Sequence, residues 1–235
     1  MPGRKWLWKK AKFAYNYLYD NHYNDYDWFY KADDDTYAII GNLRYMLLSY
    51  RADDPVYFGC KYHKYTEQGY MSGGSGYAMS KEALKRLVVD GIRKKCKSSD
   101  FGSEDVETGK CLAQVNVVAG DSRDKTGRSR FLPFRPGDFL FPHHGHPQWF
   151  HNMIYYNITQ GEECCSDHVI AFHYMRPQMM YAMEYLLKHV DVYGTSTSYA
   201  MDDKGYGRVI SQMDSELLLE ISKQEAKAEI RHKTN

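Results

Sequence analysis

Apolar residues recur along this chain at two spacings, which predict helices that alternate with short strands. Helical spacing in the first twenty residues indicates an amphipathic helix. Its buried face would carry Leu7, Ala11, Ala14 and Leu18. Further helices are expected around residues 39–50, after Ser80 and after Ser103, because serine is favoured just before a first turn. Short aromatic or β-branched runs predict strands at 27–32, 56–59, 116–120 and 169–175.

Strands that alternate with helices indicate an α/β fold with a mostly parallel sheet flanked by helices. Ligands of such sheets bind at the carboxyl ends of the strands. From about residue 202 the sequence becomes charged with a helical pattern. We therefore expect one domain over residues 1–201 and a helical C-terminal tail over 202–235.

Composition and charge narrow the classes of partner. The 31 Lys and Arg residues nearly balance the 30 Asp and Glu residues, which argues against nucleic acid and against a polybasic membrane surface. No apolar run approaches the roughly 20 residues that span a bilayer. The 22 tyrosines suit recognition of sugar rings as well as packing.

The five cysteines leave two interpretations open. No C-x-x-C spacing occurs, which argues against a structural zinc site. Either the cysteines are reduced thiols, or Cys96 and Cys111 close a loop in an oxidising compartment and Cys60 is left over. The glycosylation sequon at Asn157 favours the second interpretation.

Three adjacent carboxylates, Asp33 to Asp35, follow the first predicted strand. Like charges this close repel, and a divalent cation such as Mn²⁺ or Mg²⁺ is a fitting compensation. In extended backbone Asp33 and Asp35 would project to the same side and Asp34 to the other. The alternative is a solvated acidic turn before the next helix, although the apolar flanks favour a site.

Three other segments carry candidate groups. Gly73 and Gly74 lie in a glycine-rich turn that could bring backbone close to a ligand. Glu104 and Asp105 begin a helix, where the dipole keeps a carboxylate ionised and fit to act as a base, or where it simply supports the helix start. His173, in an apolar strand, is either a core residue or a ligand.

A histidine-rich loop surrounds Trp149, and we interpret it as a substrate-facing loop that presents aromatic rings rather than as a zinc cluster. Its histidines are His143, His144, His146 and His151.

Several motifs, in order, resemble the core 1 β1,3-galactosyltransferases, a family of inverting glycosyltransferases with a GT-A fold. They are DWFYKADDDTY, YFG, QGYMSGGSGYAMSKEALKRLV, AGDSRD, CCSD and FHY. The resemblance runs from about Gly3 to about Gly194. It implies a GT-A domain that is N-terminally truncated, without the family's upstream uridine-binding strands and membrane anchor.

The resemblance also implies roles for single residues. Asp33, Asp35 and His173 would hold Mn²⁺, and Asp105 would be the catalytic base. Gly73 and Gly74 would lie beside donor and acceptor, with Trp149 facing the acceptor sugar. Arg4 and Lys10 would lie near the diphosphate. Cys96 with Cys111, and Cys164 with Cys165, fall on positions that are disulfide-bonded in the family.

The implied reaction is transfer of galactose from UDP-galactose to O3 of GalNAc linked α to Ser or Thr of a glycoprotein, in the Golgi lumen. A homodimer is left open. The alternative function is that of a catalytically silent relative, a binding or chaperone-like partner of a full-length transferase. The retained carboxylates and His173 argue against that alternative, because a silent protein does not need a costly anionic cluster.

Overall fold

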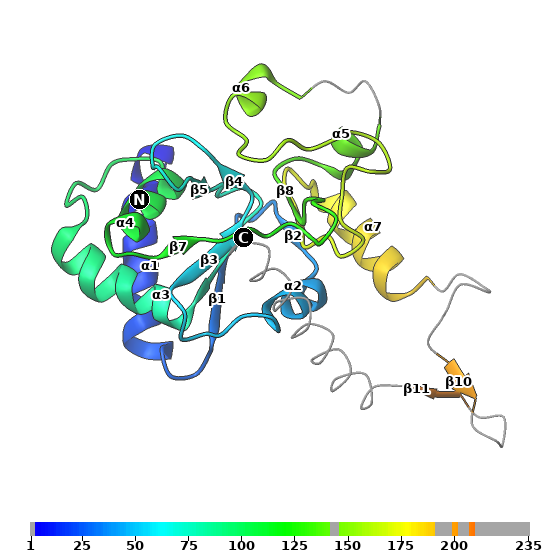
Figure 1. The fold of residues 1–235 in the computed structure, drawn as a ribbon, viewed down its shortest axis with the longest axis horizontal. Helices are drawn as coiled ribbons and strands as arrows, with labels where there is room; N and C mark the ends of the chain where they lie inside the picture. The colour runs from blue at the N-terminus through cyan, green and yellow to red at the C-terminus, as the bar shows by residue number, and fades with distance from the viewer. Residues whose placement is uncertain (1–2, 142–145, 191–198, 202–206, 210–235) are drawn as a thin grey trace, which may run out of the picture. The chain divides into compact units, whose positions relative to one another are not determined.

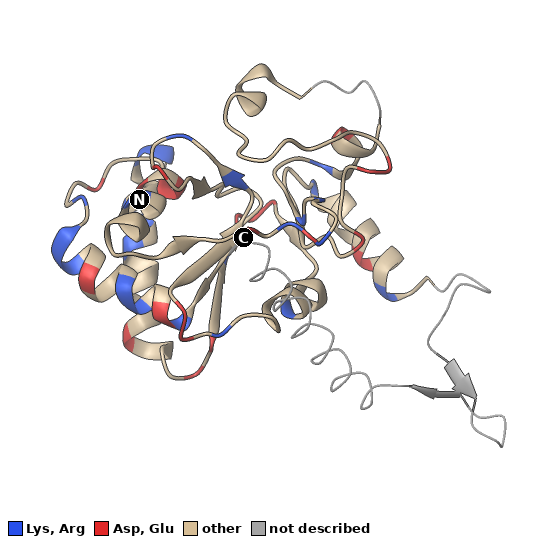
Figure 2. Cartoon of the chain, in the orientation of Figure 1, with Lys and Arg blue, Asp and Glu red and all other residues tan. Residues whose placement is uncertain are grey.

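The computed structural model describes residues 3–141, 146–190, 199–201 and 207–209. The chain forms two compact units: Met1–Leu43 with Tyr50–Met175, and Arg44–Ser49 with Arg176–Asn235. Charges of both signs are interspersed along the described helices (Figure 2), in keeping with the net charge of +1. Every residue predicted from the sequence to form a site belongs to the first unit.

The chain combines helices and strands, as the apolar pattern predicts (Figure 1), although β3 to β6 follow one another without a helix between them. The helices are η1 (Arg4–Trp6), α1 (Leu7–His22), α2 (Ile40–Leu47), α3 (Lys81–Lys85), the π-helix η2 (Arg86–Lys95), α4 (Glu104–Gln114), α5 (Pro136–Leu140), α6 (Gln148–His151) and α7 (Pro177–Lys188). The strands are β1 (Trp28–Lys31), β2 (Tyr37–Ala38), β3 (Val56–Gly59), β4 (Lys61–Tyr62), β5 (Tyr70–Met71), β6 (Tyr77–Ser80), β7 (Val118–Ala119), β8 (Phe131–Leu132), β9 (Ala171–Phe172), β10 (Tyr199–Met201) and β11 (Gly207–Val209).

The main sheet has the strand order β1-β6-β3-β7. Strands β1, β3 and β7 share one direction, while β6 lies between β1 and β3 and runs against both. The α/β class with flanking helices is confirmed, but the sheet is mixed rather than mostly parallel in its pairing. The reason is the connection between β3 and β6: it contains β4, β5 and the glycine-rich turn but no helix, so the chain returns antiparallel to β3 instead of crossing over.

A second, three-stranded sheet has the order β2-β9-β8, with β9 antiparallel to β2 and parallel to β8. Its strands are only two residues long, but they bring together segments more than 130 residues apart in sequence. This small sheet determines the geometry of the site described below.

Helices α1, α3 and α4 pack with the main sheet around one core that includes Trp8, Tyr57, Leu84 and Leu112. The buried face of α1 matches the predicted one only in part, since Ala11 and Leu18 pack against the core as predicted. Trp8 and Tyr15 are buried, whereas Leu7 is 39% exposed. Trp8 and Tyr15 take the places expected for Leu7 and Ala14 on that face, because two large rings bury more apolar area than Leu7 and Ala14 can.

Two disulfides are present, Cys96–Cys111 and Cys164–Cys165, and Cys60 is a buried free thiol. The first disulfide joins the end of η2 to the middle of α4. Both cysteine pairings implied by the family resemblance are therefore confirmed.

In the second unit, β10 and β11 pair antiparallel. The helix expected in the 202–235 tail lies outside the described residues, of which that tail contributes only β11. Among the helices of the described ranges, none is long and apolar enough to cross a membrane.

Candidate active site

The acidic turn follows β1 directly, as the sequence predicts. The amide of Thr36 donates a hydrogen bond to the carbonyl of Asp33 at 3.2 Å and closes the turn. The Thr36 hydroxyl donates to the carbonyl of Gly74 at 2.6 Å. The carboxylates are thus attached to the glycine-rich turn between β5 and β6, which brings together two segments that the sequence singled out separately.

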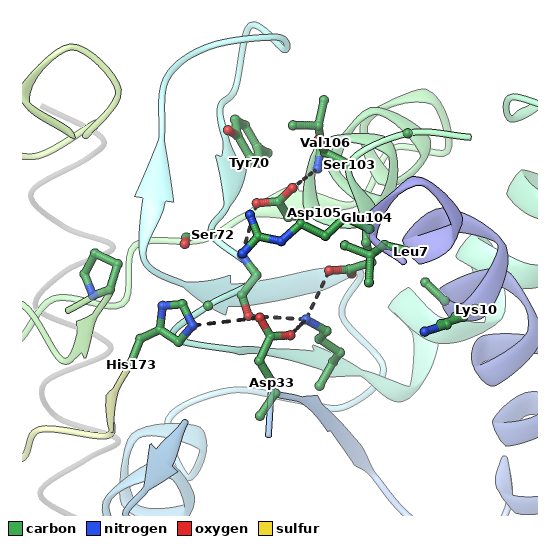
Figure 3. A pocket seen from close by; sticks show the side chains of 18 of the residues that line it. Leu7, Lys10, Asp33, Tyr70, Ser72, Ser103, Glu104, Asp105, Val106 and His173 are labelled. Atoms are coloured by element: carbon green, nitrogen blue, oxygen red, sulfur yellow. Dashed lines mark hydrogen bonds and ion pairs between the residues drawn. The ribbon is translucent and has the colours of Figure 1, made fainter. Parts of the chain in front are cut away.

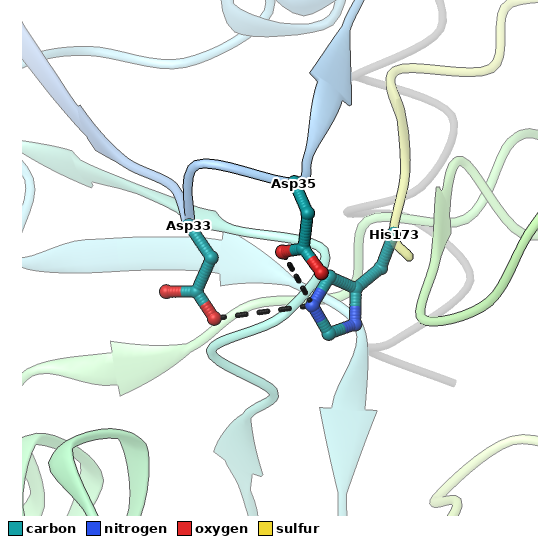
Figure 4. A group of neighbouring side chains, drawn as sticks. All are labelled: Asp33, Asp35 and His173. Carbon is teal, nitrogen blue, oxygen red and sulfur yellow. Dashed lines mark ion pairs between the residues drawn. The ribbon is translucent and has the colours of Figure 1, made fainter. Parts of the chain in front are cut away.

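His173 joins this turn through the register of the small sheet. Because Tyr37 pairs with Phe172 and Ala38 with Ala171, His173 comes next to the acidic turn just before β2. The amide of Met175 donates to the carbonyl of Asp35 at 2.9 Å and fixes the approach. His173 Nε2 lies 3.1 Å from Asp35 Oδ1 and 3.9 Å from Asp33 Oδ2 (Figure 4).

Asp33, Asp35 and His173 form a group suited to a metal ion, with one ligand atom from each within 4.8 Å of the others. Two carboxylates and an imidazole suit Mn²⁺, a divalent cation that accepts oxygen and nitrogen ligands. The imidazole lies against the backbone of Gly74, where only a hydrogen fits. The residues present therefore fit such an ion.

Asp105 lies at the first turn of α4, facing the glycine-rich turn (Figure 3). Its Oδ2 accepts from the amide of Gly73 at 3.3 Å, and its Oδ1 from the amide of Val106 at 2.8 Å. Burial, followed by the charge of Glu104, raises the pKa of Asp105 above its ordinary value. The direction is opposite to the one that the helix dipole alone predicts, because loss of hydration and a neighbouring carboxylate both disfavour the ionised form.

One pocket of about 1180 Å³ contains all of these groups. Its lining includes every predicted site residue, namely Arg4, Lys10, Asp33, Asp35, Gly73, Gly74, Asp105, Trp149 and His173. The structure thus brings these residues to one cavity, and their individual roles stay predictions.

The histidine-rich loop faces the pocket only in part, whereas the sequence predicts a substrate-facing loop. Trp149 is 48% exposed and lines the pocket, but His146 is buried among Phe134, Phe139 and Phe150. Burial lowers the pKa of His146, and His151 lowers it further. His146 is therefore a core residue rather than a substrate-facing one. Its aromatic surroundings favour the neutral form of the ring. His143 and His144 lie outside the described residues.

Among the pocket residues that sequence reasoning missed are Lys31, Tyr65 and Tyr174. The ring of Tyr174 lies 3.9 Å, centroid to centroid, from that of His173. A signal for Lys31 was present, since it precedes Asp33 by two positions and a strand places such residues on one face. The two tyrosines gave no comparable signal, because tyrosine is common throughout this chain.

Comparison with known proteins gives similarities to one family and to three relatives. The profile of the Fringe-like family matches residues 3–122. The glycoprotein-N-acetylgalactosamine 3-beta-galactosyltransferase 1 of Xenopus laevis is 43% identical over 199 residues, which cover 84% of this chain and 55% of the relative. The beta-1,3-glucosyltransferase of Mus musculus is 37% identical over 101 residues, covering 41% of this chain and 20% of the relative.

The chondroitin sulfate synthase 3 of Mus musculus is 31% identical over 114 residues, or 44% of this chain and 13% of that protein. The chain therefore spans about half the length of its Xenopus relative and smaller parts of the two mouse proteins.

Proposed function

The chain belongs to the Fringe-like family, and on that premise we propose that it is an inverting galactosyltransferase. The donor is UDP-galactose, and the acceptor is O3 of GalNAc linked α to Ser or Thr of a glycoprotein. The named activity of the Xenopus relative supports this choice of sugars. The observation that carries the proposal is the pocket that contains both the Asp33–Asp35–His173 group and Asp105.

Asp33, Asp35 and His173 hold Mn²⁺ in this proposal. When bound, the ion supplies positive charge that stabilises a departing diphosphate. Arg4 and Lys10, which line the same pocket from η1 and α1, add further positive charge for the phosphates.

Asp105 acts as the base that removes the proton from the acceptor hydroxyl as that oxygen attacks the anomeric carbon. Direct attack by the acceptor inverts the anomeric centre, so no second carboxylate is needed as a nucleophile. A raised pKa suits this task, since a base works best when its pKa lies nearer the working pH. The amide of Gly73 orients the carboxylate.

Trp149 presents an exposed ring at the pocket and supports the apolar face of the acceptor sugar. Both disulfides suit an oxidising compartment, and we place the protein in the Golgi lumen, where the proposed reaction occurs.

A transfer assay tests the proposal. The protein is incubated with UDP-galactose and a GalNAcα-Ser peptide, with Mn²⁺ or with EDTA, and the disaccharide is identified by its linkage. UDP-glucose serves as a second donor, because one relative is named a glucosyltransferase. We expect a β1,3-linked galactose only when Mn²⁺ is present. Binding of UDP and Mn²⁺ without transfer from either donor would contradict the proposal and favour a catalytically silent relative.

A further inference from the structure

Lys31, at the end of β1, lines the pocket and contacts both the acidic turn and the start of α4. Its Nζ is 2.5 Å from Asp33 Oδ1 in the acidic turn and 3.1 Å from Glu104 Oε2 at the start of α4. The ammonium thus joins two carboxylates from distant segments, Asp33 and Glu104, both of which are labelled in Figure 3. One cation therefore contacts the turn that carries the proposed metal ligands and the residue next to the proposed base.

Glu104 is held in place on its other side as well. Its Oε1 accepts hydrogen bonds from the hydroxyls of Tyr15 at 3.1 Å and Thr108 at 3.3 Å, and from that of Tyr77. Its side chain is only 7% exposed. A buried carboxylate needs both a counter-charge and hydrogen bonds, and here the hydroxyls satisfy one oxygen while Lys31 neutralises the charge.

Gly73 lies at the junction of these groups. Lys31 Nζ donates to the carbonyl of Gly73 at 3.3 Å, and the amide of Gly73 donates to Asp105 Oδ2. A Cβ at position 73 would stand 3.0 Å from Glu104 Oε2, 3.3 Å from Asp105 Cβ and 3.4 Å from Lys31 Nζ. The peptide of residue 73 thus fits into the space between Lys31, Glu104 and Asp105.

We propose that Lys31 and Glu104 form a positioning pair, which fixes the start of α4, and with it Asp105, relative to the acidic turn and the Gly73 peptide. The inference rests on the proposed transferase function for its kinetic consequence. Its structural consequence, a fixed distance between two backbone segments, does not depend on activity. The pair touches neither the donor nor the acceptor in this proposal and takes no part in proton transfer.

The test compares this pair with a matched control on the same helix. Lys97 Nζ lies 3.1 Å from Glu107 Oε1, and the Glu107 side chain is 10% exposed, yet neither residue lines the pocket. The variants are Lys31→Met, Glu104→Gln and their double, against Lys97→Met, Glu107→Gln and their double. Each double variant removes both members of its ion pair, so neither charge of the pair is left buried without its partner. If a single variant does not fold, the corresponding double variant is measured in its place.

Two measurements are made on each variant: kcat and KM for transfer, and amide hydrogen exchange of the protein without Mn²⁺. Disruption of the positioning pair should lower kcat by about 10- to 100-fold with little change in KM, because misplacement of a catalytic group by about 1 Å has an effect of this size. Exchange should rise in the peptides that contain Gly73 and Val106. The double variant should be no slower than the worse single, since the two residues act as one unit.

The control variants should lose stability without either change. Wild-type kcat and unchanged exchange at Gly73 and Val106 in the Lys31→Met/Glu104→Gln double would overturn the proposal, as would an equal loss in the Lys97 and Glu107 variants. If the wild-type protein transfers no sugar, the proposed function fails, and hydrogen exchange alone still decides whether the pair positions the two segments.

Discussion

Gly74 and His173 are in such close contact that a Cβ built at position 74 would lie 2.3 Å from Nδ1 and 2.4 Å from Cε1 of the imidazole. The glycine-rich turn therefore contacts the imidazole near Nδ1, while Nε2 of the same ring contacts the carboxylates of Asp33 and Asp35. A glycine at this position is required by space, because its backbone must pass where any side chain would displace the ring.

Gly74→Ala should weaken Mn²⁺ binding by roughly 10-fold or more, an effect expected when a residue that orients a metal ligand is changed. Calorimetric titration in the presence of UDP measures it. Gly41→Ala is the control, since a Cβ there meets nothing within 4 Å and position 41 lies in α2. That variant should keep its metal affinity and gain about 0.5–1 kcal/mol of stability. Equal affinity in both variants would contradict the contact's role.

Asp35→Ala and His173→Ala should each reduce Mn²⁺ affinity by more than about 10-fold, because each removes a proposed ligand rather than a supporting group. Asp34→Ala provides the matched control, since Asp34 lies between two members of the metal group without belonging to it. We expect near wild-type affinity for that variant in the same titration. A loss in Asp34→Ala as large as in Asp35→Ala would indicate a general effect of negative charge instead of specific ligands.

Asp105→Asn should lower transfer by roughly 100-fold or more, since an amide cannot accept the acceptor's proton. Its effect on stability has a predictable sign. The folded protein raises the pKa of Asp105, so ionisation costs native stability as the pH rises from the ordinary value of about 4 through the raised value. The variant lacks that cost.

The thermal midpoint of Asp105→Asn should therefore rise relative to that of the wild type as the pH increases from the ordinary pKa of about 4 through the raised pKa of Asp105. Melting curves at several pH values test this expectation. A gap between the two midpoints that is constant across this range would mean that burial of Asp105 has no electrostatic cost, whereas near wild-type turnover would remove Asp105 as the base.

Glu104→Gln should shift the acid limb of the kcat/KM profile to lower pH. Burial is the main cause of the raised pKa of Asp105, and the charge of Glu104 is the next, so neutralising Glu104 lowers that pKa. The profile of kcat/KM reports the free enzyme, and the residual activity of the variant suffices to measure it. Glu107→Gln, farther along α4, should leave the limb in place. A shift of the acid limb to higher pH in Glu104→Gln would show that the limb does not report the ionisation of Asp105.

The two disulfides should differ in their effect on stability. Cys96 and Cys111 are 15 positions apart, and replacing both by Ser should cost about 3 kcal/mol in the loop-closure account. Cys164 and Cys165 are neighbours, so their bond closes almost no loop and constrains the unfolded chain little. Chemical denaturation of the two double-serine variants compares them. Equal losses would show that local contacts, not chain entropy, set the contribution of each disulfide.

Local patterns in the sequence anticipated much of the first unit. The acidic turn follows a strand, Ser80 accepts a hydrogen bond from the amide of Ala83 at 3.0 Å as a helix cap, and Asp105 begins a helix. These features depend on a few consecutive residues, whose backbone preferences act wherever the segment lies in the fold. The order of the motifs added the family resemblance, and with it Arg4 and Lys10, which also line the pocket.

Helix α1 shows where such patterns fail. Its period was right, but its buried face lies at Trp8 and Tyr15 rather than at Leu7 and Ala14. Periodicity gives the width of an apolar stripe, and the stripe's position depends on what packs against it. Here Tyr15 reaches Glu104, a partner 89 positions away that the helix itself cannot reveal.

The sequence alone determined the candidates for the chemistry: the carboxylates of the acidic turn, the glycines, Asp105 and His173. Tertiary structure decided how they meet. A pairing of two residues in each of β2 and β9 brings His173 to Asp35, and the ammonium of Lys31 joins Asp33 to Glu104. It also set the direction of the Asp105 pKa, because hydration and neighbouring charge exist only once distant segments have packed.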